Sequence, residues 1–163
     1  MQMDVVTEKI LTAVGGFLEL GMPVDAAKEL ERLPPEVKNS TQVLKVSAPI
    51  YHAATAWEQL ETVARELVKR EPDEPGWRVS LAFAVRRSTD IASAQTILLE
   101  AERQHPEDAT IHFNLGCYAC QLGDLEEAKH RIIHAIKIDS GFRAIALADR
   151  DLEPLWDNIS TGL

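Results

Sequence analysis

The sequence contains few cysteines, no long apolar run and no excess of basic residues. Its two cysteines are too few for a disulfide framework, and this usage is typical of a reducing cytoplasm. No apolar stretch approaches the roughly 18 residues that a membrane-spanning helix needs, and the first residues lack the basic and apolar regions of a signal peptide. The net charge of −9 disfavours sequence-independent nucleic-acid binding. We therefore expect a cytoplasmic protein that binds neither a membrane nor nucleic acid.

The composition is that of a globular protein with a core of its own. Apolar residues make up 45% and charged residues 26% of the 163 positions. This length suits a single domain, which we place at residues 1–163.

A fixed period of 34 residues runs through most of the chain. One turn position recurs four times at this spacing: Gly21, Thr55, Thr89 and Gly123. A position on the helix after that turn recurs in the same way: Ala26, Leu60, Ala94 and Ala128. We therefore expect four repeats, at approximately residues 7–40, 41–74, 75–108 and 109–140, and a C-terminal segment at 141–160.

Each repeat is predicted to form two helices. In the fourth repeat, residues 109–122 form an apolar run of helical length that ends before a glycine. Asp124 then stands three residues before Glu127, which is typical of a capped helix start, and apolar residues follow at helical spacing. In the third repeat Asp90 is the expected cap, and in the second we expect Thr55 to have this role. Strand-like alternation does not recur, so the sequence predicts an all-α protein.

Prolines make the first half of the chain less regular. Pro34 and Pro35 end the second helix of the first repeat early, because proline cannot continue a helix, and we expect a loop at residues 35–40. Pro49 lies inside the first helix of the second repeat, where it predicts a kink or a new helical segment.

Small residues mark the positions where two helices must cross closely, because only Ala or Gly lets the backbones approach. These positions are Ala82, Ala94, Ala101, Gly116, Ala128 and Ala135. In the fourth repeat, the small residues and the residues beside them resemble the tetratricopeptide repeat (TPR). The matching residues are Leu115-Gly116, Gly123-Asp124, Glu127-Ala128, Ala135 and Asp139-Ser140. The third repeat is similar through Leu81-Ala82, Asp90, Ala94, Ala101 and Pro106. The aromatic residue that the family has near the start of each first helix is replaced by Leu44, Arg78 and His112.

The resemblance implies a right-handed superhelical solenoid of antiparallel helix pairs, in which the first helices line a concave groove. Binding a peptide or a protein segment is the usual task of such a groove, and the resemblance implies neither enzymatic activity nor a cofactor. Residues 142–159 are predicted to cap the last repeat, because a terminal repeat must cover its apolar face. The apolar residues available for this are Phe142, Ile145, Leu147, Leu152, Leu155 and Trp156.

Charge is unevenly distributed between the helices. The first helices of repeats two to four, at residues 41–54, 76–88 and 109–122, contain no acidic residue but hold Lys45, Arg78, Arg86 and Arg87. A neutral-to-basic groove in an acidic protein would attract an anionic segment. Burial of these helices is an alternative explanation for the missing acids, although it does not explain the retained arginines.

The repeat register selects the residues that would face the groove. They are Gln42, Lys45, His52, Ser80, Phe83, Arg86, Arg87, Phe113, Asn114, Cys117 and Gln121. The arginines suit bidentate pairing with carboxylates, and Asn114 suits a hydrogen bond to a ligand backbone. Phe83 and Phe113 suit apolar side chains, or they pack between adjacent repeats.

Motifs with chemical activity are weak in this sequence. Cys117 and Cys120 form a C-x-x-C, but they lie inside a predicted helix without a neighbouring strand or further metal ligands. His130 and His134 share one helix face, which favours a solvated surface over a metal site. Phosphate loops and hydrolase motifs are absent from the sequence. We therefore expect no catalytic residues and no metal.

Three functions remain open at this point. The leading hypothesis is a non-catalytic adaptor that binds a segment of another protein, with acidic character, in the groove. The alternative is a self-assembling homodimeric scaffold that uses exposed residues of the first repeat, such as Val5, Val6, Ile10 and Phe17. A thiol-active protein is the third, and it requires a low thiol pKa or a bound metal.

Overall fold

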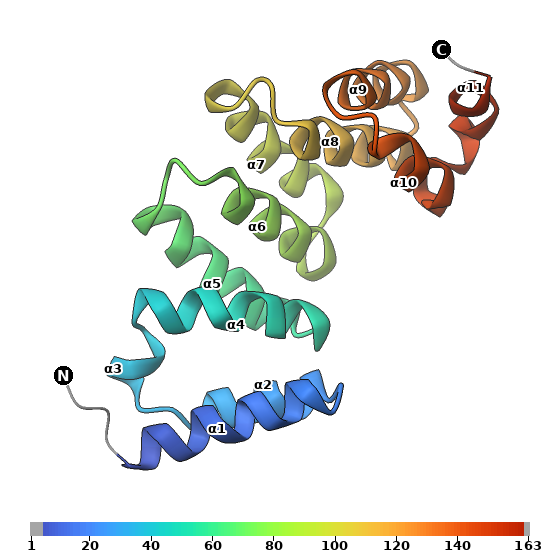
Figure 1. Cartoon of the computed structure of the whole chain (residues 1–163). Coiled ribbons are helices and arrows are strands. Elements are labelled where there is room, and N and C mark those ends of the chain that lie inside the picture. Colours follow the sequence, from blue (N-terminus) through green and yellow to red (C-terminus); the bar gives the residue numbers. More distant parts are fainter. Residues whose placement is uncertain (1–4, 162–163) are drawn as a thin grey trace. The chain divides into compact units, whose positions relative to one another are not determined.

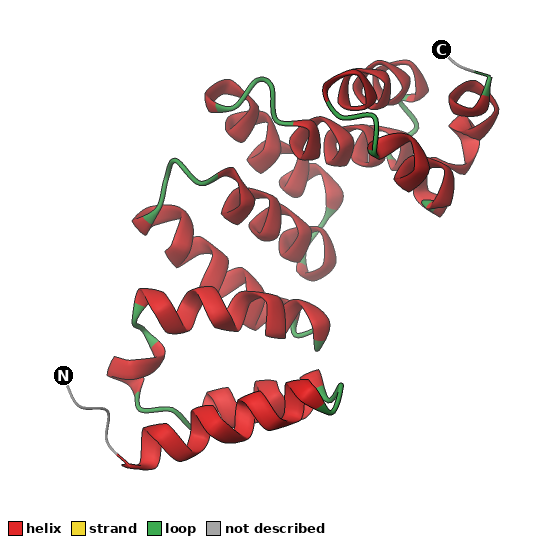
Figure 2. Ribbon diagram, viewed as in Figure 1, coloured by secondary structure: helices red, strands yellow, loops and turns green. Residues whose placement is uncertain are grey.

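The computed structural model describes residues 5–161, and every regular element in this range is a helix (Figures 1 and 2). The chain divides into two compact units, Met1–Ala84 and Val85–Leu163, and the boundary falls within α6 (Pro75–Ser88). The all-α prediction is confirmed, whereas the single domain expected at residues 1–163 stays a prediction. Within residues 5–161, no helix combines the length and the apolar character needed to cross a membrane.

The first unit consists of two helix pairs and the beginning of a third. Helix α1 (Val5–Glu19) pairs with α2 (Pro23–Glu31), and α4 (Thr41–Ala53) pairs with α5 (Trp57–Arg70). Helix α2 also packs on α4, so the pairs form successive layers (Figure 1). The core between them contains the buried residues Ile10, Val14, Leu30, Leu44, Leu60 and Leu67.

The second unit continues the same arrangement and ends in a cap. Helix α7 (Ile91–Gln104) packs on α8 (Ala109–Gln121), which pairs with α9 (Leu125–Ile138). The capping segment follows as α10 (Phe142–Ala148), the 3₁₀-helix η1 (Arg150–Leu155) and α11 (Trp156–Ser160). The core of the second unit contains the buried side chains Leu98, Ile111, Leu115, Tyr118, Ile132, Leu152, Leu155 and Ile159.

Aspartates begin the helices of the second unit as the sequence predicts. Asp90 accepts a hydrogen bond from the Ser93 amide at 2.7 Å, and Asp124 accepts one from the Glu127 amide at 3.1 Å. The predicted Thr55 cap is wrong: α5 begins at Trp57 after Ala56, without a side-chain cap. Thr55 instead forms the turn with a φ of +55°.

This turn conformation explains one column of the repeat. Gly21 and Gly123 also have positive φ, at +67° and +86°. Glycine adopts this left-handed region without a steric penalty, whereas the branched Cβ of threonine disfavours it. Thr89, the fourth member of the column, is not among the described residues with positive φ.

The predicted close helix crossing is present between α8 and α9. A Cβ added to Gly116 would lie 2.6 Å from Ile132 Cδ1 and 2.8 Å from its Cγ1. Helices α8 and α9 can therefore pack this closely because Gly116 has no side chain.

The first half of the chain differs from expectation at two prolines. Residues 35–40 are not simply a loop, because Pro35–Lys38 form the short helix α3. Pro49 does not divide α4, which continues from Thr41 to Ala53. Since proline has no amide hydrogen, the carbonyl oxygen of Lys45 lacks its usual helical donor.

The cap is built from fewer apolar residues than expected. Leu152 and Leu155 are buried, and the Trp156 indole donates to the Ala146 carbonyl oxygen at 3.0 Å. Ile145 and Leu147, in contrast, remain 51% and 37% exposed, because α10 turns these side chains towards solvent.

Candidate functional site

Three of the predicted groove residues meet in one cleft of the first unit. Lys45 and His52 on α4 lie with Ser80 on α6 around a cleft of about 390 Å³. We call it the α4–α6 cleft; its other lining residues are Ala48, Pro49, Leu60 and Trp77. Lys45, Pro49 and His52 follow one another at helical spacing, so they share a face of α4. Gln42 is exposed on the same helix but does not line the cleft.

A carboxylate holds the cation of this cleft in place. Lys45 Nζ lies 3.0 Å from Glu71 Oε1, and the Trp77 indole donates to Glu71 Oε2 at 2.8 Å. The hydrogen bond from Trp77, followed by that from Lys45, holds the pKa of Glu71 below its usual value. Arg78 on α6 does not line the cleft and donates to the carbonyl oxygen of Pro72 at 2.6 Å.

Aromatic rings adjoin the cleft. The rings of His52 and Phe83 have centroids 4.7 Å apart, and Trp57 lies 5.9 Å from His52 and 5.7 Å from Phe83. Phe83 is half-buried. Such a cluster fixes the orientation of the His52 ring at the edge of the cleft.

In the second unit, the chain's own capping segment contacts four of the predicted groove residues, namely Arg86, Phe113, Cys117 and Gln121. Phe113 is buried against Phe142, with ring centroids 5.0 Å apart. Cys117 is buried with its Sγ 3.8 Å from Asp149 Oδ2.

Asp151 of the same segment reaches two more of these residues. Gln121 donates to the Asp151 carbonyl oxygen at 3.2 Å, and Arg86 forms an ion pair with the Asp151 carboxylate. Arg86 also lies over the Tyr118 ring. Asn114 donates to the Thr110 carbonyl oxygen at 2.8 Å, and Arg87 is exposed.

The expectation of an open groove along α8 therefore does not describe this unit. The sequence predicts the cap correctly, but periodicity places a cap only at the end of the repeats. It does not indicate that residues 142–151 fold over the predicted groove face of α8.

The thiol and histidine motifs lack the features of a reactive site. Burial, together with the charges of Asp149 and Asp151, raises the pKa of Cys117 well above its usual value. The pKa of Cys120 is raised for the same reasons. Both cysteines are free and buried, so a thiol-active function lacks the low pKa that it requires. In residues 5–161, no group of three or more His, Cys, Asp or Glu side chains is arranged to hold a metal ion.

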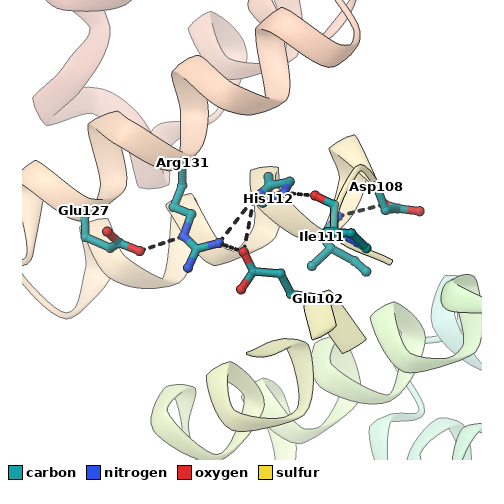
Figure 3. Close-up of polar contacts among 7 residues, drawn as sticks. Glu102, Asp108, Ile111, His112, Glu127 and Arg131 are labelled. Atoms are coloured by element: carbon teal, nitrogen blue, oxygen red, sulfur yellow. Dashed lines mark hydrogen bonds and ion pairs between the residues drawn. The ribbon is translucent and has the colours of Figure 1, made fainter. Parts of the chain in front are cut away.

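A half-buried polar cluster in the second unit is missed by sequence reasoning. Arg131 on α9 contacts Glu102 on α7, and its Nε donates to Glu127 at 2.6 Å (Figure 3). His112 Nε2 lies 2.6 Å from the Pro106 carbonyl oxygen, which only accepts, so Nε2 carries the proton. Nδ1 then accepts from Arg131 Nη1 at 3.2 Å.

The repeat register contained a signal for this cluster. Position 131 corresponds to Val63 and Ile97 in the two preceding repeats, and position 102 corresponds to Val68 and Ile136. Opposite charges at two otherwise apolar positions indicate a partly buried ion pair between repeats.

A second cleft of about 550 Å³ lies between α3, α4 and α5. Helix α2 has 9 residues where α5 has 14, so it ends before it can cover this space. Tyr51, which lines the cleft, is buried and donates to Glu31 Oε1 at 2.7 Å. Glu31 also forms an ion pair with Lys38. Both basic and acidic side chains, among them Lys38 and Glu66, line this second cleft, so its charge does not favour one class of ligand.

Comparisons with known proteins identify the fold. No family model and no curated protein sequence matches the chain. Among solved structures, residues 41 to the end of MamA from Desulfovibrio magneticus RS-1 align with a TM-score of 0.70 at 16% identity, over 98% of this chain and 94% of that one. A thermophilic TPR protein of Thermus thermophilus aligns with a TM-score of 0.65 at 21% identity, over 96% of this chain and 83% of that one.

A third structure is the first TPR of Spaghetti (RPAP3) bound to the HSP90 peptide SRMEEVD. It aligns with a TM-score of 0.59 at 17% identity, over 74% of this chain and 90% of that one. The chain is thus an all-α protein with the TPR fold, which confirms the resemblance seen in the sequence.

Proposed function

We propose that the protein is a non-catalytic adaptor that binds a segment of a partner protein in the α4–α6 cleft. One observation carries this proposal: Lys45, His52 and Ser80, from two successive first helices, surround a single open cleft. The corresponding face of α8 is covered by the capping segment, so the cleft is the better docking site. A volume of about 390 Å³ accommodates a few residues of an extended segment.

The chemistry of the cleft favours an acidic segment. A ligand carboxylate would compete with Glu71 for Lys45. The Spaghetti TPR provides support by analogy, because the HSP90 peptide in that structure contains two glutamates and a terminal aspartate.

Peptide selection tests the proposal. Random peptides of about 12 residues displayed on phage are selected on the full chain, and enriched sequences are measured by fluorescence anisotropy. We expect acidic sequences, with an affinity at least tenfold lower for Lys45→Glu, which corresponds to about 1.4 kcal/mol. Lys69→Glu is the matched control, because Lys69 is an exposed α5 lysine in an ion pair with Glu66 and does not line the cleft. Equal binding to wild type and Lys45→Glu would exclude this cleft.

A self-assembling scaffold is the second candidate function. The observation that favours it is the exposure of large apolar side chains around α1, where Val5, Val6 and Leu20 are 65%, 63% and 74% exposed. Sedimentation velocity over a range of concentrations distinguishes a homodimer from a monomer.

The cytoplasmic location expected from the cysteine content stays a prediction, which cell fractionation tests.

A further inference from the structure

The α4–α6 cleft contains two donors that already bind a carboxylate of this chain. The ammonium group of Lys45 lies 3.0 Å from Glu71 Oε1, and the indole nitrogen of Trp77 donates to Glu71 Oε2 at 2.8 Å. Each carboxylate oxygen therefore has its own donor, one charged and one neutral. Lys45 and Trp77 line the cleft, whereas Glu71 belongs to the turn between α5 and α6. The two donors thus form part of the surface that a bound segment would meet.

The two donors differ in how firmly they are held. The half-buried ring of Trp77 packs against the core of the first unit, so packing fixes the direction of its N–H group. Lys45 has a flexible side chain that is 47% exposed, and its ammonium group can follow a carboxylate over a short distance. The site therefore keeps its shape when one carboxylate replaces another, because the rigid donor sets the position and the flexible cation adapts to it.

Glu71 can leave this site without a change in the backbone. Its amide donates to the Leu67 carbonyl oxygen at 2.8 Å, and its own carbonyl oxygen accepts from the Glu74 amide at 3.2 Å. These bonds hold the turn in place, while the side chain of Glu71 is 30% exposed. A change of side-chain rotamer therefore carries the carboxylate away from the two donors and into water.

A site that is already occupied selects for a charged ligand. The bonds from Trp77 and Lys45 hold the pKa of Glu71 below its usual value, so the site favours an ionised carboxylate. A segment that displaces Glu71 with a carboxylate of its own leaves both donors paired. A neutral or basic segment that displaced Glu71 would leave the ammonium and indole N–H groups without an acceptor, which is costly in a partly buried cleft.

We propose that Glu71 occupies the carboxylate-binding site of the α4–α6 cleft in the free protein, and that an Asp or Glu side chain of the partner segment replaces it on Lys45 and Trp77. The present occupant is itself a side-chain carboxylate, and it shows how the ligand group binds, with one oxygen on each donor. This inference rests on the proposed binding of an acidic segment and names the donors that receive it. Glu71 then acts as an internal competitor, which lowers the affinity and raises the selectivity for acidic segments.

Peptide affinity tests the exchange. The acidic peptides selected on the full chain are synthesised with an amidated C-terminus, so that side chains supply their only carboxylates, and are measured by fluorescence anisotropy. Glu71→Gln keeps the shape of the side chain but loses the ion pair with Lys45, so it should bind these peptides at least about fivefold more tightly than wild type. Glu74→Gln removes a charge from the same turn and keeps the oxygen that accepts from the Gly76 amide. It is the matched control and should change the affinity less than about twofold.

A small carboxylate tests the two donors directly. Glu71→Ala vacates the site, and acetate corresponds to the part of the side chain that is lost. At constant ionic strength, with chloride as the reference anion, acetate should cause a saturable shift of the Trp77 indole N–H signal in the NMR spectrum of Glu71→Ala. Trp77→Phe assigns this signal. Wild type and Glu74→Ala should show no such shift, because Glu71 still occupies the site, and Lys45→Met added to Glu71→Ala should abolish it.

The outcomes separate this inference from the proposed function. Acidic peptides that depend on Lys45 but bind wild type and Glu71→Gln equally would overturn the exchange and leave binding in the cleft intact. An acetate shift that is absent from Glu71→Ala, or that persists without Lys45, would overturn the assignment of the donors. Peptides that bind only with a free C-terminus would overturn the assignment to a side chain. If wild type and Glu71→Gln both bind no acidic peptide, the exchange and the proposed function are both wrong.

Discussion

The aromatic rings of Phe113 on α8 and Phe142 on α10 pack with their centroids 5.0 Å apart. Phe113 occupies a groove position of the repeat, so this contact shows how the chain's own C-terminal segment covers the face of α8. Farther along the same segment, Asp149 contacts Cys117 and Asp151 forms an ion pair with Arg86. The basic residue Arg86 is therefore paired with an acid of its own unit, whereas the open cleft lies in the first unit.

Leu152 anchors this segment, and its truncation should loosen the second unit. The side chain is fully buried, so Leu152→Ala should lower the free energy of unfolding by about 2–5 kcal/mol. Ile145→Ala, at a site that is 51% exposed, is the control and should cost less than about 1 kcal/mol. Urea unfolding measures both values.

Thiol labelling provides an independent readout of the same change. Leu152→Ala should accelerate the reaction of Cys117 with a disulfide reagent, because the capping segment then opens more often. An unchanged labelling rate would show that the segment does not protect this cysteine.

Thr55 is predicted to be strained, and replacing it should stabilise the protein. Its φ of +55° costs a residue with a Cβ about 1–2 kcal/mol, whereas glycine adopts it freely. Because glycine also gains entropy in the unfolded chain, we expect Thr55→Gly to raise the free energy of unfolding by at most about 1 kcal/mol. Thr89→Gly, in the same column but not among the described residues with positive φ, should instead be destabilising. Chemical denaturation gives the free energy of unfolding of both variants. A lower value for Thr55→Gly than for wild type would show that the Thr55 backbone is not strained.

The fold is predictable from the sequence because the repeat leaves direct physical traces. Turn residues with positive φ, aspartate caps and small residues such as Gly116 recur at a fixed spacing, and each reports a local requirement of the backbone. The cleft residues Lys45, His52 and Ser80 follow from the same register, because it determines which helix face they share.

Other features depend on contacts that the period does not describe. The Arg86–Asp151 ion pair joins residues 65 positions apart, and no repeat register relates them. The Thr55 cap is wrong because residue type alone does not distinguish a capping threonine from one that replaces a turn glycine. Which cations are free to bind a ligand likewise depends on partners such as Glu71, whose position comes from the inter-repeat turn.

Acid should weaken the contact between α2, α3 and α4. Burial alone would raise the pKa of Glu31, but hydrogen bonds from Lys38 and Tyr51 outweigh it and hold the pKa below the ordinary value of 4.5. The ionised carboxylate therefore stabilises the fold above pH 4.5, and this contribution is lost as the pH falls through the lower folded-state pKa. Between about pH 5 and 3, wild type should lose more stability than Glu31→Gln, as measured by urea unfolding at each pH. Parallel losses in both proteins would exclude this linkage.

The half-buried Arg131 cluster provides the sharpest test of the second unit. The Arg131 side chain is only 14% exposed, and that of Glu102 is 25% exposed. Arg131→Ile leaves Glu102 without its counter-ion and should cost about 2–4 kcal/mol. The double variant Arg131→Ile with Glu102→Ile restores the apolar pattern of the other repeats, so it should recover most of this loss. Arg65→Ile, which removes an ion pair with an arginine that is 54% exposed, should cost less than about 1 kcal/mol. Urea unfolding of wild type, Arg131→Ile, Glu102→Ile and the double variant gives the coupling energy. A double variant as unstable as Arg131→Ile would show that the ion pair is not the reason for the loss.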